Sequence, residues 1–131
     1  MTTNQIHQKL SNFVAFQHQT TINIIDMVHP FIEDKLPELT EIFKKYRVKK
    51  AYVFGSAVTD KFTDTSDVDF LIEPVEPRDE PDPAVRGAIL WELYFALEDL
   101  MKREVDMVTK NSLTNKYFIQ ELNRTAIVIY G

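Results

Sequence analysis

The amino-acid sequence predicts a small α/β domain, with a mixed sheet of about four strands and helices mainly on one face. Short apolar runs typical of strands occupy residues 51–54, 68–72, 105–109 and 126–130. Between them lie segments in which apolar residues recur every three or four positions, the spacing of helices. Strands and helices that alternate along one short chain are typical of this fold class.

Length and composition favour a single domain without disulfides. The chain has 131 residues, 44% of them hydrophobic, and no cysteine, so it can bury a core but cannot form thiolate metal sites. No apolar stretch has transmembrane length and the first residues lack the pattern of a signal peptide, so we expect a cytoplasmic protein without a membrane partner. The net charge of -5 makes nucleic acid an unlikely partner.

The first part of the chain has only loose helical patterning, which predicts one or two helices over residues 4–29. We expect residues 1–35 to form an N-terminal helical extension, packed on the core or used in an interface. Residues 36–131 then form the main domain.

A helix over residues 37–46 leads into the first strand. Leu39, Ile42, Phe43 and Tyr46 follow helical spacing, and Pro37 suits a first helical turn. Basic residues cluster where this helix ends: Lys44, Lys45, Arg47, Lys49 and Lys50. Ligands of α/β sheets gather beyond the carboxyl ends of the strands, so we favour solvated cations at the helix terminus over a phosphate-binding or partner-binding patch.

The first two strands are joined by a turn that carries polar residues. The first strand ends at Gly55-Ser56, and ten residues later Asp67-Val68-Asp69 opens the second. Residues two apart on a strand point to the same face, so Asp67 and Asp69 lie together while Val68 enters the core.

This arrangement predicts a site for a metal ion and a phosphate. Adjacent carboxylates repel each other unless a cation lies between them, and oxygen ligands suit Mg²⁺ bound together with a substrate phosphate. Gly55 permits a tight turn, and Ser56 offers a hydroxyl and an N–H group to phosphate oxygens.

Residues 73–83 contain four prolines and five acidic residues, which predicts a loop, and we favour an acidic linker over a lid on the site. A helix follows over residues 84–102. Its core stripe is Val85, Ile89, Leu93, Ala96, Leu97 and Leu100, and its other side carries Trp91, Tyr94 and Phe95. We expect this second face to lie in an interface, with a homodimer or a partner protein slightly favoured over the N-terminal extension.

The last part of the chain adds one more acidic residue on a strand. Asp106 lies in the strand over residues 105–109. Asn111 or Ser112 then caps a helix that runs to about residue 123, before the final strand.

Together these elements resemble the minimal nucleotidyltransferases of the DNA polymerase β superfamily. The signature of that family is Gly-Ser, a spacer of roughly ten residues and Asp-x-Asp on a strand. Gly55-Ser56 and Asp67-Val68-Asp69 match it, and Val105-Asp106-Met107-Val108 matches the family's third carboxylate on a later strand. The resemblance covers about residues 36–131 and implies the polymerase β-like fold.

The resemblance also implies a reaction, in which AMP passes from ATP to an acceptor hydroxyl and pyrophosphate is released. Two Mg²⁺ ions held by Asp67, Asp69 and Asp106 would assist it, with Gly55 and Ser56 at the phosphates. Many relatives have an arginine after Gly-Ser. Here residues 57–61 offer only Lys61, so Lys61 is the nucleotide-binding candidate and Lys102, Arg103 and Lys116 are possible replacements.

The chain is too short to hold a separate acceptor-binding domain, so we expect a protein acceptor. Small members of the family resemble antitoxins that accompany a HEPN-type ribonuclease toxin and can inactivate it by adenylylating a tyrosine. The resemblance therefore implies a HEPN-type protein partner. The alternative is a catalytically weak or inactive binding module that neutralises its partner by stoichiometric contact.

Overall fold

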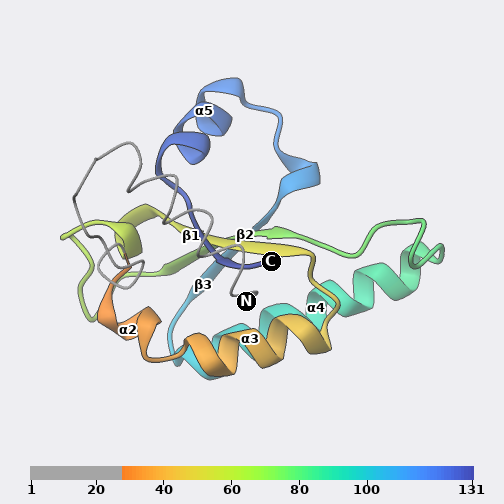
Figure 1. Ribbon diagram of the computed structural model, residues 1–131, viewed down its shortest axis with the longest axis horizontal. Helices are drawn as coiled ribbons and strands as arrows, with labels where there is room; N and C mark the ends of the chain where they lie inside the picture. Colours follow the sequence, from red (N-terminus) through yellow and green to blue (C-terminus); the bar gives the residue numbers. More distant parts are fainter. Residues whose placement is uncertain (1–27) are drawn as a thin grey trace, which may run out of the picture.

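The computed structural model of the chain describes residues 28–131, which form one mixed four-stranded sheet flanked by helices (Figure 1). The strands are β1 (Lys50–Phe54), β2 (Val68–Glu73), β3 (Val105–Thr109) and β4 (Ile127–Tyr130), in the spatial order β3-β2-β1-β4. β1 is antiparallel to both of its neighbours, whereas β2 and β3 are parallel. The predicted fold class is confirmed. The helices predicted within residues 1–27 lie outside the described part of the chain.

Helices cover both faces of the sheet unequally. On one face lie α2 (Pro30–Glu33), α3 (Leu36–Lys45) and α4 (Pro83–Met101), and α5 (Lys116–Thr125) stands alone on the other (Figure 1). The arrangement follows from strand alternation, because Val68, Phe70 and Ile72 enter the α3–α4 core while Leu71 packs in a smaller cluster with Leu122 of α5. Helices therefore lie mainly on one face, as predicted.

The larger core includes residues that precede the predicted domain boundary at residue 36. Val28 and Ile32 are buried within it, and the His29 N–H donates to the Ala57 carbonyl oxygen at 3.0 Å. The segment from residue 28 onward is thus packed on the sheet.

α4 is longer than the sheet it covers. Its buried residues are Leu93, Leu97 and Met101, all in its carboxyl-terminal half, while Val85 is 39% exposed. The first turns of α4 extend beyond the sheet (Figure 1). Val85 therefore does not belong to the core stripe, contrary to the prediction from its spacing.

α5 begins later than predicted. Residues 110–112 form a short 3-10 turn, η3 (Lys110–Ser112), in which the Ser112 hydroxyl donates to the Thr109 carbonyl oxygen at 2.8 Å. The residue that caps α5 is Asn115, whose side-chain oxygen accepts from the Tyr117 and Phe118 N–H groups. The expectation that Asn111 or Ser112 caps this helix is wrong, because the turn uses these residues locally.

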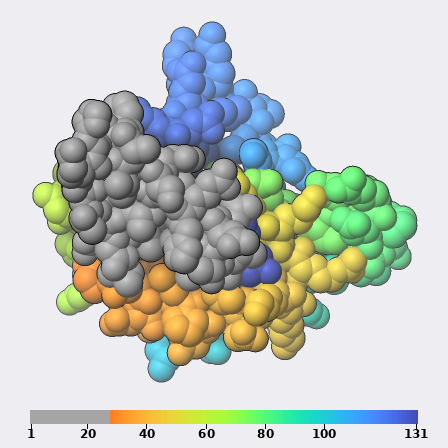
Figure 2. All heavy atoms as spheres, in the orientation of Figure 1, coloured from red at the N-terminus to blue at the C-terminus, as the bar shows by residue number. Residues whose placement is uncertain are grey.

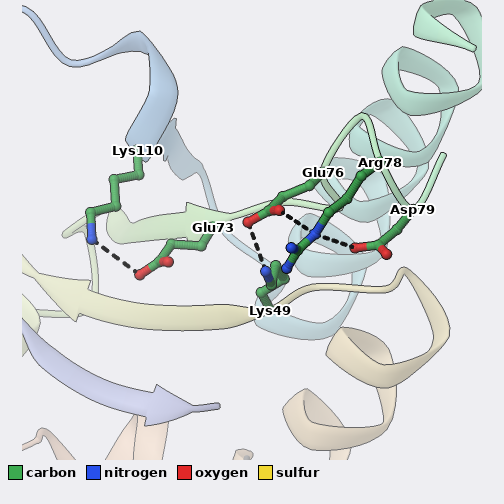
Figure 3. A network of polar contacts seen from close by, with 6 residues as sticks. All are labelled: Lys49, Glu73, Glu76, Arg78, Asp79 and Lys110. Carbon is green, nitrogen blue, oxygen red and sulfur yellow. Dashed lines mark hydrogen bonds and ion pairs between the residues drawn. The ribbon is translucent and has the colours of Figure 1, made fainter. Parts of the chain in front are cut away.

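The acidic loop after β2 is tied to the corner between α3 and β1. The Lys49 ammonium lies 2.7 Å from the Glu76 carboxylate (Figure 3). The Arg47 guanidinium donates to the Asp79 carbonyl oxygen at 2.7 Å. In the space-filling view the loop forms a projection in contact with the residues around Lys49 (Figure 2). Part of the basic cluster thus anchors this loop.

This anchoring also fixes where the loop lies relative to the acidic residues. The loop leaves the carboxyl end of β2, whereas Asp69 lies near the strand's beginning. The loop is therefore held at the end of the sheet away from the candidate site, which favours the linker interpretation.

Within residues 28–131, no helix combines the length and the apolar character needed to cross a membrane.

Candidate active site

Asp69 and Asp106 are cross-strand neighbours. They are directly paired in the parallel register of β2 and β3. Leu71 and Val108, two residues further along each strand, pack in the α5-side cluster, so Asp69 and Asp106 lie on that same face of the sheet. Asp67, one residue before β2, is exposed and close enough for its charge to act on Asp69.

The turn after β1 passes directly against Asp69. Gly55 opens a 3-10 turn, η2 (Gly55–Val58), with φ of +69°, a conformation that side chains with a Cβ rarely adopt. A Cβ at position 55 would overlap the Asp69 carboxylate oxygen Oδ2. Glycine is therefore required both for the backbone conformation and for the close approach of the turn to Asp69.

Burial and neighbouring carboxylates raise the pKa of Asp69. Burial, followed by the charges of Asp106 and Asp67, raises the pKa of Asp69 from 3.8 to about 6. Within residues 28–131, none of these three carboxylates forms an ion pair or hydrogen bond with another residue. Their negative charge is uncompensated, and a bound cation would relieve it.

The donor set fits Mg²⁺ held jointly with a nucleotide. In the described part of the chain, no three His, Asp or Glu side chains are arranged to hold a metal ion by themselves. Mg²⁺ typically takes one or two carboxylates from a protein and completes its shell with water and substrate phosphates. Asp67, Asp69 and Asp106 are the residues that would supply those carboxylates.

The two remaining predicted residues lie near the turn but have no contact that assigns them a role. Ser56 belongs to η2 and is half-buried, and its carbonyl oxygen accepts from the Thr59 N–H and hydroxyl. Lys61 is exposed, and its ammonium pairs with no residue in the region from 28 onward. Nucleotide binding by Ser56 and Lys61 therefore stays a prediction.

Arg103 holds the loop that carries Asp67, a role that sequence reasoning missed. Its guanidinium donates to the carbonyl oxygens of Thr63 and Ser66 at 3.0 and 3.1 Å. It also lies 4.0 Å from the centroid of the Phe31 ring and 4.8 Å from that of Phe62. Arg103 is thus occupied with the protein itself. No sequence signal indicated this contact, because its partners are backbone carbonyls far away in the chain.

α5 borders the site on the side of η2. The ring of Phe118 meets Phe54, the residue before Gly55, edge to face at a centroid distance of 6.0 Å. Tyr117 beside it is 73% exposed, with the Lys116 ammonium 5.6 Å from its ring centroid. Lys116 therefore begins the helix that contacts the end of β1, whereas Lys102 is the exposed carboxyl-terminal cap of α4.

Comparison with known proteins places most of the chain in one family. Residues 37–131 match the family model described as "Polymerase beta, Nucleotidyltransferase". The Methanocaldococcus jannaschii protein named "Putative protein adenylyltransferase MJ0126" is 37% identical over 89 residues, which cover 68% of this chain and 84% of that protein. A second protein of that organism, "Putative protein adenylyltransferase MJ1217", is 34% identical over 102 residues, covering 72% and 97%.

Solved structures share the fold at lower sequence identity. A structure described as "Structure of putative minimal nucleotidyltransferase" has a TM-score of 0.57 at 22% identity, and the match covers 82% of this chain and 97% of that chain. A toxin–antitoxin structure with AMP-PNP has a TM-score of 0.56 at 18% identity, covering 73% of each chain. A complex of a tri-AMPylated Shewanella oneidensis HEPN toxin with MNT antitoxin has a TM-score of 0.51 at 17% identity, and the match covers 76% of this chain and 71% of that chain. The family match and the two Methanocaldococcus jannaschii relatives show that the chain belongs to the polymerase β nucleotidyltransferase family, whose fold these structures share.

Proposed function

We propose that the chain is a Mg²⁺-dependent protein adenylyltransferase that moves AMP from ATP to a hydroxyl of a HEPN-type toxin and so acts as its antitoxin. The observation that carries this proposal is the register pairing of Asp69 with Asp106 beneath the Gly55 turn. The names of the archaeal relatives support a protein acceptor, and the toxin–antitoxin complexes of similar fold support the class of partner.

The residues divide between phosphate binding and metal binding. Ser56 would offer its N–H and hydroxyl to the triphosphate, because η2 brings this residue next to the Gly55 turn that passes over Asp69. Asp67, Asp69 and Asp106 would hold Mg²⁺. When bound, Mg²⁺ would neutralise the phosphate charge and stabilise the attacking and leaving oxygens.

The proposed transfer forms one P–O bond and breaks another. The acceptor hydroxyl oxygen attacks the α-phosphorus of ATP, and the bond from that phosphorus to the bridging oxygen of the β-phosphate breaks, which releases pyrophosphate. Asp106 is the exposed member of the register pair, so its carboxylate can receive the hydroxyl proton directly.

One observation favours the alternative of a catalytically weak binding module. Among the described residues, no Lys or Arg side chain is hydrogen-bonded or ion-paired within the Gly55–Val58 turn, and Arg103 is engaged elsewhere. The triphosphate would then be held with few cations of the protein. This alternative predicts silencing of the partner without transfer.

Isotope transfer separates the two proposals. The chain is incubated with Mg²⁺, a HEPN-type protein, and ATP labelled at either the α- or the γ-phosphate. We expect α-label on the partner and γ-label in pyrophosphate. Asp69→Asn and Asp106→Asn should abolish labelling, whereas Glu41→Gln on the exposed surface of α3 should leave it unchanged. Silencing of the toxin by both of the first two variants at the wild-type level would support the binding module instead.

A further inference from the structure

An open groove lies between α4 and the edge strand β3. Gly87, Leu90, Trp91 and Tyr94 of α4 and Met107 of β3 line a volume of about 430 Å³, and we call it the aromatic groove. Trp91 is 64% exposed and Phe95, on the same helix, is 57% exposed. The rings of Trp91 and Phe95 are stacked with their centroids 5.7 Å apart, so the exposed rings are preordered against each other.

The fold does not use these rings for its core. α4 packs on the sheet through Leu93, Leu97 and Met101, on the other side of the helix from the exposed rings. Gly87 lies at open space in the groove: a Cβ at this position would meet no atom within 4 Å, so neither packing nor the backbone requires a glycine there. Large apolar surfaces left exposed in this way mark sites where another molecule binds.

The groove lies close to the candidate active site but on the opposite face of the sheet, around the edge of β3. Met107 directly follows Asp106 on β3 and packs on the α4 side, whereas Asp106 lies on the α5 side, and the outer edge of β3 is unpaired among the described strands. Electrostatics agree with this proximity, because the pKa of Tyr94 is raised by its hydrogen bond to Glu98, then by burial, and further by the charges of Glu98, Glu104 and Asp106. A molecule seated in the groove therefore reaches Asp106 by extending around the free edge of β3.

Charge indicates which molecule fits. From Ala84 to Met101 the chain carries three acidic residues, Glu92, Glu98 and Asp99, and one basic residue, Arg86. The Arg86 guanidinium is turned to the Glu80 carbonyl oxygen, at 2.6 Å. A second copy of this chain packed face to face would bring these acidic residues against their equivalents, and such like-charge contacts disfavour association. A partner protein with an apolar side chain flanked by Lys or Arg complements both the exposed rings and the acidic residues of α4.

We propose that the aromatic groove is the docking surface for the protein acceptor. An apolar side chain of the acceptor, flanked by basic residues, enters the groove and brings the acceptor hydroxyl to the edge of β3 that carries Asp106. This inference rests on the proposed function, because it assigns to the acceptor the surface through which that reaction is directed to one partner.

The only tryptophan of the chain gives a direct test. Trp91 is replaced by 5-hydroxytryptophan, which can be excited separately from tryptophans of the partner, and fluorescence is followed as the HEPN-type protein is added. We expect a solvent-exposed, iodide-quenchable emission in the free protein that becomes shielded on binding. Emission shielded already in the free monomer would show that the chain covers the groove itself, and shielding in a dimer of the chain would assign the groove to a second copy; both results overturn the proposal.

Substitutions then measure the groove's part in binding. Trp91→Ala and Glu92→Lys should each weaken binding of the HEPN-type protein about tenfold or more and raise the KM for this acceptor, while kcat at saturation is kept. Glu41→Lys, the same charge reversal on the exposed face of α3, should change binding less than about twofold. Wild-type affinity in both groove variants would refute the proposal.

Binding measured with Asp106→Asn keeps the two proposals distinguishable. If Trp91→Ala weakens binding in this background while the wild type transfers no label, docking is correct and the reaction is wrong. If the wild type transfers label and Trp91→Ala binds and transfers normally, the reaction is correct and the acceptor docks elsewhere.

Discussion

Asp69→Asn should stabilise the protein in the absence of nucleotide and metal. The substitution removes a charge that is held near Asp67 and Asp106 without a compensating cation. The rise of the Asp69 pKa from 3.8 to about 6 corresponds to a loss of about 3 kcal/mol in the free energy of unfolding, at 1.36 kcal/mol per pKa unit. Asp69 keeps some contact with solvent, which screens the charges, so we expect about half of this, roughly 1.5 kcal/mol, at pH 7.

The pH dependence of this gain has a defined sign. Because the folded state binds the Asp69 proton more tightly than the unfolded state, the contribution of Asp69 to stability is most favourable below pH 3.8 and is lost as the pH rises to about 6. The variant lacks this proton, so its advantage should be near zero at the acidic end and complete above about pH 6. Activity, in contrast, should be lost at every pH.

Urea denaturation of the wild type and Asp69→Asn at several pH values measures this difference in the free energy of unfolding. In thermal denaturation at pH 7, the melting temperature of Asp69→Asn should be higher than that of the wild type by on the order of 5 °C. Glu92→Gln, an exposed carboxylate on α4, is the matched control and should shift the unfolding free energy by less than about 0.5 kcal/mol. Equal stability of Asp69→Asn and wild type at pH 7, or a gain that persists at the acidic end, would show that carboxylate crowding does not destabilise the fold.

Three further substitutions test contacts at the site and at the loop after β2. Gly55→Ala should destabilise the fold by at least about 1–2 kcal/mol and abolish nucleotide transfer, because its Cβ would overlap the Asp69 carboxylate. The control Gly87→Ala should stabilise α4 by up to about 1 kcal/mol. Equal changes of the two melting temperatures would show that Gly55 does not lie against Asp69 as described. Arg103→Met should lower the free energy of unfolding, measured by urea denaturation, by about 1–3 kcal/mol, because two carbonyl contacts and two ring contacts are lost. The control Arg124→Met removes an exposed ion pair and should lower the free energy of unfolding by less than about 0.5 kcal/mol. Lys49→Met should raise the pKa of Glu76, which its hydrogen bond to Lys49 now lowers; an unchanged NMR titration of Glu76 would show that the contact does not form in solution.

Local pattern predicted the parts of the fold that depend on periodicity. α3 and α4 begin and end within one residue of the predicted bounds, because both have proline in the first turn and α4 has an apolar repeat over its whole length. The pairing of Asp69 with Asp106 could be predicted only through the family motif, since nothing in either strand by itself specifies their register.

Other features depend on contacts that no local pattern encodes. The start of α5 was misplaced because Ser112 and Asn115 are both good capping residues, and the choice between them follows from the η3 turn. From the sequence, Arg103 was a candidate to bind phosphate, but in the fold its guanidinium contacts two aromatic rings and two carbonyl groups. Asp67 was expected on the strand, yet β2 begins at Val68, so Asp67 belongs to the loop that Arg103 holds.

The position of β3 at the edge of the sheet makes one half of the acidic pair easier to detach than the other. Among the described strands, β3 is hydrogen-bonded to β2 alone, whereas β2 lies between β1 and β3. An edge strand can open in a local event that costs less free energy than global unfolding. Such an opening would carry Asp106 away from Asp69 while the sheet of β2, β1 and β4 stays folded. We therefore expect mild denaturant or warming to inactivate the protein before its circular dichroism changes, with early hydrogen exchange confined to β3.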